Sequence, residues 1–393
     1  MTTYDPYHPF LPEHKQNLYE HMAATRQQCP VAHVYVPNSP VPFFFISLDE
    51  DVRMLLENKG NQISCKGNFE LEGAKNKAVT QIDGEPHEQL RNALRQALNV
   101  RRYREITPFI EQKTNQLIDA LEARAAQTGQ RRGDLVQDLT APLPTAVLFH
   151  LIGIPQENIP EFRGWIHEII SITPAPIWDT PAWKSFGAFI DKLIQERREN
   201  PQDDLLTQLI NDPAIAEDAT QLHIFQLLVA GSDTTTQYAG SLLYHLLEKR
   251  EERWEQLLQR PQSALPLAIE EGLRYDPPVI WLMRTAEQPI TLRGVEIPAG
   301  SRLLVGLASA NRDASVWKDA DLFVLDRAGA GRHVSFGYGA HYCLGAELAR
   351  KQVNILLRLL LERMPTLSLA EGFAYQDIPA PVFRGPITLP VTW

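Results

Sequence analysis

The sequence is poor in cysteine, with only Cys29, Cys65 and Cys343 among 393 residues. Their spacing does not match a metal-binding cluster, and an odd number leaves one thiol outside any set of disulfides. This usage is typical of a reducing compartment. The chain also lacks a hydrophobic run long enough to cross a membrane, since the run at 41–48 is far too short. These absences predict a cytoplasmic protein without a zinc site, a signal peptide or a membrane anchor.

The sequence also lacks serine- and glycine-rich linkers, internal repeats and long blocks of like charge. We therefore expect residues 1–393 to form a single domain, although the length alone would allow two or three. Hydrophobic residues make up 44% of the chain, which is enough for a substantial core. The net charge of −10 argues against nucleic acid as a general partner.

Helical periodicity dominates the pattern of apolar residues. Spacings of three and four residues predict helices near 50–58, 86–99, 105–127, 158–172, 182–198, 203–211, 219–249, 263–275 and 344–363. Short segments bounded by proline and glycine predict strands near 32–36, 42–47, 290–297, 302–306 and 386–392. The sequence thus predicts a mainly α-helical fold with small β-sheets.

Cys343 lies in a glycine-rich run, since residues 336–345 read FGYGAHYCLG. A predicted helix begins directly after it, so the sulfur would lie at a helix N-terminus. Free amides and the helix dipole favour a thiolate there. A lone thiolate on such a loop is one of the recognised ligands of haem iron. The alternative is a buried free cysteine beside an ordinary turn.

The centre of the predicted helix at 219–249 contains weak helix formers, with 230–236 reading AGSDTTT. Locally unfavourable sequences of this kind often mark functional sites. Gly231 would leave room for a small ligand, while Asp233 and Thr234 could hold water and pass protons. The alternative is a hydrated kink that serves only packing.

Together these motifs resemble the cytochrome P-450 superfamily, the haem-thiolate monooxygenases. The run at 336–345 fills every specified position of the family's cysteine-ligand loop, and 230–234 matches its oxygen-binding groove. The resemblance implies a triangular helical prism with a β-rich side region, haem b as cofactor, and Cys343 as the axial iron ligand. It further implies that Asp233 and Thr234 are catalytic. The implied cofactor-binding residues in the two motifs are Ala230, Gly231, Phe336, Gly337, His341, Cys343 and Gly345.

Two further pairs match motifs of the same family. His87 and Arg91 fit its His-x-x-x-Arg helix, and with Arg284 and His341 they are implied ligands of the haem propionates. For an isolated pair at this spacing the alternative is a solvated helix face. Glu271 and Arg274 lie one helical turn apart, and the resemblance implies a buried structural ion pair tied to the loop before Cys343. Taken alone, such a pair is commonly exposed to solvent.

The activity implied is insertion of one oxygen atom from dioxygen into a small, mostly apolar substrate by hydroxylation, dealkylation or epoxidation. Electrons would come from a separate ferredoxin or flavodoxin and its reductase. Alternatives are a hydrogen-peroxide-driven peroxygenase and a non-catalytic haem sensor. The acid–alcohol pair at 233–234 argues against both.

A local excess of positive charge predicts where the electron donor binds to an expected monomer. The stretch from 91 to 104 holds five arginines and no acid. We expect a docking patch that includes Arg95, Arg101, Arg102 and Arg104, near Arg350 and Lys351. The alternative is an ordinary solvated face.

The substrate-contacting residues are expected in 62–80, 169–186, 226–230, 279–283 and 382–383, where the pockets of the family lie. The candidates are Gln226, Val279, Ile280, Leu282 and Phe383. Gln226 shares a helix face with Ala230 and Thr234, so it should lie one turn further out in the pocket. Its amide either finds an ordinary protein or water partner or binds a polar group of the substrate.

Overall fold

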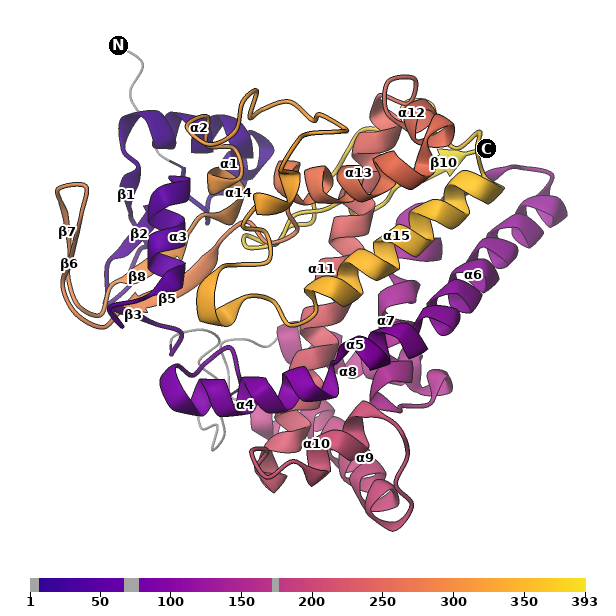
Figure 1. Ribbon diagram of the computed structural model, residues 1–393, viewed down its shortest axis with the longest axis horizontal. Coiled ribbons are helices and arrows are strands. Elements are labelled where there is room, and N and C mark those ends of the chain that lie inside the picture. Colours follow the sequence, from indigo (N-terminus) through magenta and orange to yellow (C-terminus); the bar gives the residue numbers. More distant parts are fainter. Residues whose placement is uncertain (1–6, 67–77, 172–176) are drawn as a thin grey trace.

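The computed structural model describes residues 7–66, 78–171 and 177–393 (Figure 1). Helices dominate, which confirms the predicted fold class. The longer ones are α2 (Leu18–Gln28), α3 (Asp49–Glu57), α4 (Gly84–Ala97), α6 (Thr107–Thr128), α7 (Pro142–Ile152), α8 (Ile159–Ser171), α9 (Pro181–Glu199), α10 (Leu205–Asn211), α11 (Thr220–Glu248), α13 (Pro261–Tyr275) and α15 (Ala346–Arg363). The shorter ones are α1 (Pro12–Gln16), α5 (Val100–Glu105), α12 (Trp254–Gln259) and α14 (Leu307–Ala310).

A five-stranded sheet lies to one side of the helices, beside α2, α3 and α14 (Figure 1). Its order is β1 (Val31–Val34), β2 (Phe43–Ile46), β8 (Arg302–Val305), β5 (Leu282–Ala286) and β3 (Ile63–Ser64). Only the β2–β8 pair is parallel, with Phe43 opposite Arg302. The other strands form the hairpin of β6 (Ile290–Leu292) with β7 (Val295–Ile297) and a small sheet of β4 (Arg132–Asp134), β10 (Pro390–Thr392) and β9 (Ser368–Leu369). The strand predicted at 386–392 is therefore confined to its last residues.

The helix α11 runs through the middle of the helical region, where α7, α13 and α15 contact it (Figure 1). It is helical from Thr220 to Glu248 without a break, so the weak formers at its centre do not interrupt it. The hydroxyl groups of Thr234 and Thr236 donate to backbone carbonyls one turn earlier, at 2.6 and 3.0 Å. These bonds satisfy the hydroxyls inside the helix.

The large helical core and the core beneath the sheet meet around the segment that precedes α15. Val334 is fully buried in the sheet core, and Phe336 packs against the helical core. The loop at 336–345 therefore spans the boundary between the two cores. This position places Cys343 beside α11.

Candidate active site

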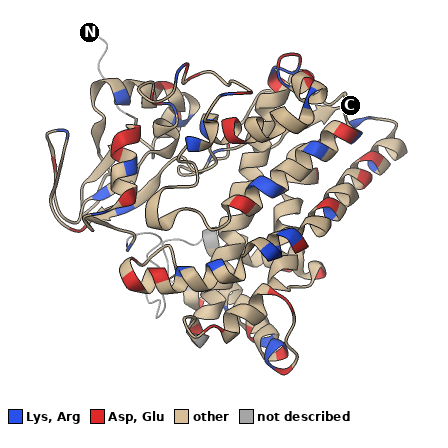
Figure 2. Cartoon of the chain, in the orientation of Figure 1, with Lys and Arg blue, Asp and Glu red and all other residues tan. Residues whose placement is uncertain are grey.

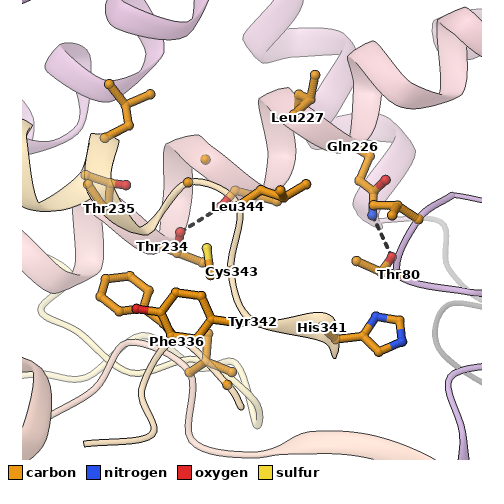
Figure 3. A pocket seen from close by; sticks show the side chains of 18 of the residues that line it. Thr80, Gln226, Leu227, Thr234, Thr235, Phe336, His341, Tyr342, Cys343 and Leu344 are labelled. Carbon is orange, nitrogen blue, oxygen red and sulfur yellow. Dashed lines mark hydrogen bonds between the residues drawn. The ribbon is translucent and has the colours of Figure 1, made fainter. Parts of the chain in front are cut away.

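The loop at 336–345 presents the sulfur of Cys343 to an internal cavity (Figure 3). The Cys343 amide donates to the carbonyl oxygen of Phe336 at 2.9 Å, which closes the loop. Gly337 and Gly339 have φ angles of +75° and +71°, a region that favours glycine. A Cβ on Gly339 would lie 2.5 Å from the backbone oxygen of Leu56. Glycine there lets α3 pack directly on the loop, and this contact holds the sulfur in place.

The thiol of Cys343 faces the cavity but is enclosed by protein on its other sides. Burial raises its pKa, against the opposing effects of the Gly345 and Ala346 amides and of Arg91 and Arg350. The helix start at Ala346 is where the sequence predicts it, within two residues. The net shift of the pKa of Cys343 is upward, because burial outweighs the nearby amides and arginines.

At one end of the cavity the structure brings together His87, Arg91, Arg284 and His341. The rings of the two histidines lie 3.9 Å apart, centre to centre. The Nε2 atom of His87 is buried and has no partner among the described residues. Burial, followed by the charges of His341 and Arg91, lowers the pKa of His87 to about 4. This cluster of donors is suited to anionic oxygen atoms.

Sequence reasoning missed Asp83, which organises this end of the cavity. Asp83 directly precedes α4, where a carboxylate usually caps the helix, yet it makes no cap bond. Its oxygens instead accept from the Ser64 hydroxyl at 2.8 Å and the Cys65 amide at 2.9 Å, and lie 3.1 Å from Nε2 of His341. Despite partial burial, hydrogen bonds to His341, Cys65 and Ser64 hold the pKa of Asp83 well below its usual range. The side chain of Asp83 therefore orients His341.

One face of α11 forms a wall of the cavity. The residues on it are His223, Gln226, Leu227, Ala230, Gly231, Thr234, Thr235 and Tyr238. The hydroxyl of Thr234 lies near Cys343 in Figure 3, while Gln226 lies further along the helix beside Thr80. The predicted common face of Gln226, Ala230 and Thr234 is thus present.

Gly231 is predicted to leave room for a small ligand, but the position that its missing side chain would occupy faces Leu148 on α7. A Cβ there would lie 3.0 Å from a methyl carbon of Leu148 on α7. The glycine therefore allows α7 and α11 to approach closely, in addition to lining the cavity.

Asp233 lies outside the lining of the cavity and its side chain is exposed. Desolvation by the surrounding protein nevertheless raises the pKa of the carboxyl, opposed by Arg163. Although they are neighbours in the sequence, Asp233 and Thr234 thus differ in surroundings, because consecutive helical residues point in different directions.

The cavity has a volume of about 330 Å³, and most of its walls are apolar. Of the predicted substrate contacts, Gln226, Val279 and Leu282 line it. The prediction for Ile280 is not met, because Ile280 is fully buried in the core against the sheet. Phe383 pairs with Val279 in a β-bridge but also lies outside the lining. Parts of the predicted segments 62–80 and 169–186, namely 67–77 and 172–176, lie outside the described residues.

Glu271 and Arg274 form a fully buried ion pair, with two bonds of 2.7 and 2.8 Å. Arg274 also donates to the carbonyl oxygens of Asn311, Ala320 and Leu322. These three acceptors lie in the segment that leads to the cysteine loop. The pair thus anchors that segment to α13, as the resemblance implies.

Acidic and basic residues are interspersed over the molecule (Figure 2), and two of the five arginines in the basic stretch form ion pairs with described acids. Arg102 is buried and donates to Asp203 at 3.0 Å, so its charge is already compensated. Arg101 pairs with Glu105 at 2.6 Å. Arg350 is likewise bound, by Glu270, at 2.6 Å. Arg95 and Arg104 are exposed and form no ion pair with any residue that the structure describes.

Comparison with known proteins places this site in a family. Residues 7–367 match the model of the family "Cytochrome P450". The chain is 31% identical to nocardicin C N-oxygenase of Nocardia uniformis over 98% of both chains. It is 34% identical to the polyketide biosynthesis cytochrome P450 PksS of Bacillus subtilis, over 73% of this chain and 70% of that one.

Solved structures agree with this placement. The structure of PksS has a TM-score of 0.87 at 29% identity and covers 98% of this chain and 99% of its own. CYP109Q5 of Chondromyces apiculatus has a TM-score of 0.88 at 25% identity, covering 99% and 98%. Among the described helices, none has the length and hydrophobicity needed to cross a bilayer. The chain has the cytochrome P-450 fold and belongs to the cytochrome P-450 family, monooxygenases that bind haem b through a cysteine thiolate and incorporate oxygen from dioxygen.

Proposed function

We propose that the thiolate of Cys343 would ligate the haem iron and that His87, Arg91, Arg284 and His341 would hold the propionates. The residues present fit this cofactor. The sulfur faces the cavity, and the buried Nε2 of His87 needs a partner that no described residue supplies. An anionic propionate oxygen would satisfy it.

When bound, haem supplies the activation of dioxygen and the transfer of one oxygen atom to the substrate. The chain supplies the surroundings. Thr234 holds a hydroxyl in the cavity, and Asp233, being exposed, can exchange protons with water. The raised pKa of the Asp233 carboxyl keeps a proton available at higher pH. Leu227, Val279 and Leu282 exclude water and favour an apolar substrate.

The observation that carries this proposal is the convergence of the Cys343 sulfur, the Thr234 hydroxyl and apolar walls on one cavity. The residues that line it range from Cys65 to Gln352, so we infer that the whole chain acts as one catalytic domain. We further infer a reducing cytoplasm, because all three cysteines are free, and we propose that the protein is a monomer. Its electrons come from a separate ferredoxin or flavodoxin.

Thiolate ligation is tested by the absorption spectrum of the reduced, carbon monoxide-bound protein. We expect the strongly red-shifted Soret band of a thiolate ligand. Cys343→Ser should lose that band, whereas Cys29→Ser, which changes a cysteine outside the cavity lining, should keep it. A wild-type band in Cys343→Ser would exclude Cys343 as the ligand.

Proton delivery is tested with Thr234→Ala and Asp233→Asn. Thr234→Ala should bind substrate and accept electrons normally but release more of them as hydrogen peroxide, because the ordered hydroxyl is lost. Thr234→Ser, which keeps the hydroxyl, should stay close to wild type. Asp233→Asn should slow turnover about 10²-fold, the lower end for an acid–base group. Unchanged coupling and rate in both variants would reduce these residues to structural ones.

Supplying either NADPH with a redox partner or hydrogen peroxide alone distinguishes the monooxygenase from a peroxygenase and from a haem sensor. With a ferredoxin and its reductase, NADPH consumption should be coupled to product. A peroxygenase would form product equally well from hydrogen peroxide alone, and a haem sensor would form none under either condition. The exposed acid and the cavity hydroxyl favour the monooxygenase.

A further inference from the structure

A buried histidine on α11 has no role in the site described so far. His223 is 3% exposed and lines the cavity about three helical turns before Thr234. Its Nδ1 atom is buried and lacks a hydrogen-bond partner among the described residues. Buried polar atoms in proteins nearly always have a partner. Nδ1 of His223 therefore needs a hydrogen-bond partner that no described residue supplies, and the side chain that carries it lines the cavity.

The lining of the cavity as a whole is mostly apolar. Aliphatic residues line it from α4 and its C-cap residue and from α7 and α10, namely Leu94, Leu98, Leu148, Leu151 and Leu205. Burial lowers the pKa of His223 to about 4, so the imidazole is neutral at physiological pH. A neutral imidazole offers one donor and one acceptor.

Gln226 stands one turn further along the same helix face. Its Nε2 donates to the hydroxyl oxygen of Thr80 at 2.6 Å (Figure 3). This bond fixes the amide, and the carbonyl oxygen has no partner within the described part of the chain. The expected protein partner is thus present for the NH2 group of the Gln226 side chain and absent for its carbonyl oxygen among the described residues. The carbonyl oxygen remains an acceptor.

Among the described residues of the cavity lining, no permanently charged cation lies beside these two residues on α11. The permanently charged residues in the cavity lining are Arg91 and Arg284. Both belong to the cluster with His341 to which we assign the propionates. A carboxylate buried beside His223 and Gln226 would lose its hydration without gaining a counter-charge. A neutral group would not bear that penalty.

We propose that His223 and Gln226 form a specificity subsite for a neutral hydrogen-bonding group, such as a hydroxyl or carbonyl, on an otherwise apolar substrate. This inference rests on the proposed monooxygenase function and narrows its substrate class. At 1.5 Å per helical residue, Gln226 and His223 lie roughly 12 and 16 Å along α11 from Thr234. The preferred substrate is therefore elongated, with its polar group about that far from the carbon that is oxidised.

The haem-loaded enzyme can be titrated with three probes of the same twelve-carbon chain: 1-dodecanol, dodecane and dodecanoate. Binding is read from the shift of the Soret band. We expect 1-dodecanol to bind tighter than both other probes. Tighter binding of dodecanoate would overturn the proposal and indicate an anion-binding subsite instead.

Substitutions of His223 and Gln226 test whether these two residues cause the preference for 1-dodecanol. His223→Phe and Gln226→Leu should each weaken 1-dodecanol binding about three- to tenfold, the range of one neutral hydrogen bond. Dodecane should bind as before or slightly tighter. His223→Asn should recover part of the alcohol preference because it restores polar atoms. Leu94→Met, a matched change in an apolar lining residue, should leave the alcohol-to-alkane ratio unaltered.

The same variants distinguish failure of the subsite from failure of the parent function. If both His223→Phe and Gln226→Leu keep the wild-type alcohol-to-alkane ratio, the subsite does not exist. The thiolate Soret band and NADPH-coupled oxidation would then still stand for the monooxygenase. As a second readout, wild type should oxidise 1-dodecanol mainly near the end remote from its hydroxyl, and Gln226→Leu should broaden the product distribution. An unselective wild type would also contradict the proposal.

Discussion

At the scale of single residues, Gly339 allows the cysteine loop and α3 to touch. It has a positive φ, and a side chain there would also collide with the backbone oxygen of Leu56. Gly372 has nearly the same φ, +72°, but no atom lies within 4 Å of its vacant Cβ position. A side chain at Gly372 would bear only the penalty of a positive φ, whereas a side chain at Gly339 would bear that penalty and a steric clash as well.

Gly372→Ala should destabilise the protein by about 1–2 kcal/mol, the usual penalty for a left-handed residue with a side chain. Gly339→Ala should exceed this value because the loop must also move away from α3. It should lose haem more readily as well, since the same loop carries Cys343. Thermal unfolding and the rate of haem transfer to an apo-globin acceptor measure the two effects. Equal destabilisation by both substitutions would mean that the contact with Leu56 is easily relieved.

The residues that the sequence predicts best are those inside contiguous motifs, such as Cys343 and Thr234. Their spacing alone places them on a loop and on a helix face. Asp83 and His223 escape such reasoning because each looks ordinary in its local sequence, as a helix cap and as a core histidine. The neighbours of Asp83 are Ser64, Cys65 and His341, which are far from it in the sequence or on other elements. His223 lines a cavity to which several helices contribute.

At the scale of elements, the ends of α11 and α13 are joined by a buried histidine. His245 lies 2.8 Å from a carboxylate oxygen of Asp276 and 3.1 Å from one of Glu248. Arg253 and Arg384 neutralise the two acids. Burial alone would lower the pKa of His245, but hydrogen bonds to Asp276 and Glu248 outweigh it and raise the pKa. The protonated imidazole therefore stabilises the junction of these helices.

Because the pKa of His245 is higher in the folded than in the unfolded state, its contribution to stability is complete below about pH 6.5. That contribution is lost as pH rises through the raised folded pKa. The difference in melting temperature between wild type and His245→Asn should therefore be largest near pH 6 and shrink towards pH 9. A difference that is constant or grows over this range would contradict the assignment.

His150→Asn provides a control of opposite sign. His150 stacks on Phe109, and burial lowers its pKa. Any stability that the neutral His150 ring provides should therefore be complete above about pH 6.5 and be lost as pH falls below it, towards the lowered folded pKa.

The prediction of elements succeeded where burial is one-sided. The helices α4, α9 and α15 have alternating apolar and polar faces, and the sequence predicts each of them. The helix α7 was missed because it is buried almost all round, from Leu143 to Ile152, so its apolar residues show no helical period. It also begins with two prolines, Pro142 and Pro144, which a helix tolerates only in its first turn.

At the scale of the whole molecule, local sequence charge is a poor guide to surface charge. Five arginines in fourteen residues suggest a strongly basic patch. Asp203, from a distant segment, pairs with two of these arginines, and Glu270 likewise pairs with Arg350 outside the stretch. Only a fold brings those acids near, so the sequence could not reveal the cancellation. Arg95 and Arg104 remain as candidates for contact with an acidic electron donor.

Arg95→Glu and Arg104→Glu should slow reduction by an acidic ferredoxin several-fold at low ionic strength. The effect should disappear near 1 M salt, where the screening length falls to about 3 Å. Lys192→Glu makes the same change on the distant helix α9 and should have little effect. Stopped-flow reduction under carbon monoxide measures the rate. Equal slowing by all three substitutions would point to net charge rather than to a docking site.

The ammonium group of Lys15, on α1, donates to the backbone oxygens of Ile378, Ala380 and Phe383. The strand β10 likewise pairs with β4, more than 250 positions earlier. During synthesis these early segments emerge from the ribosome long before their partners exist. Contacts between such distant residues form slowly. The amino-terminal helices must therefore wait, incompletely docked, until translation is nearly finished, and a chaperone that shields them in that interval should raise the yield of active enzyme.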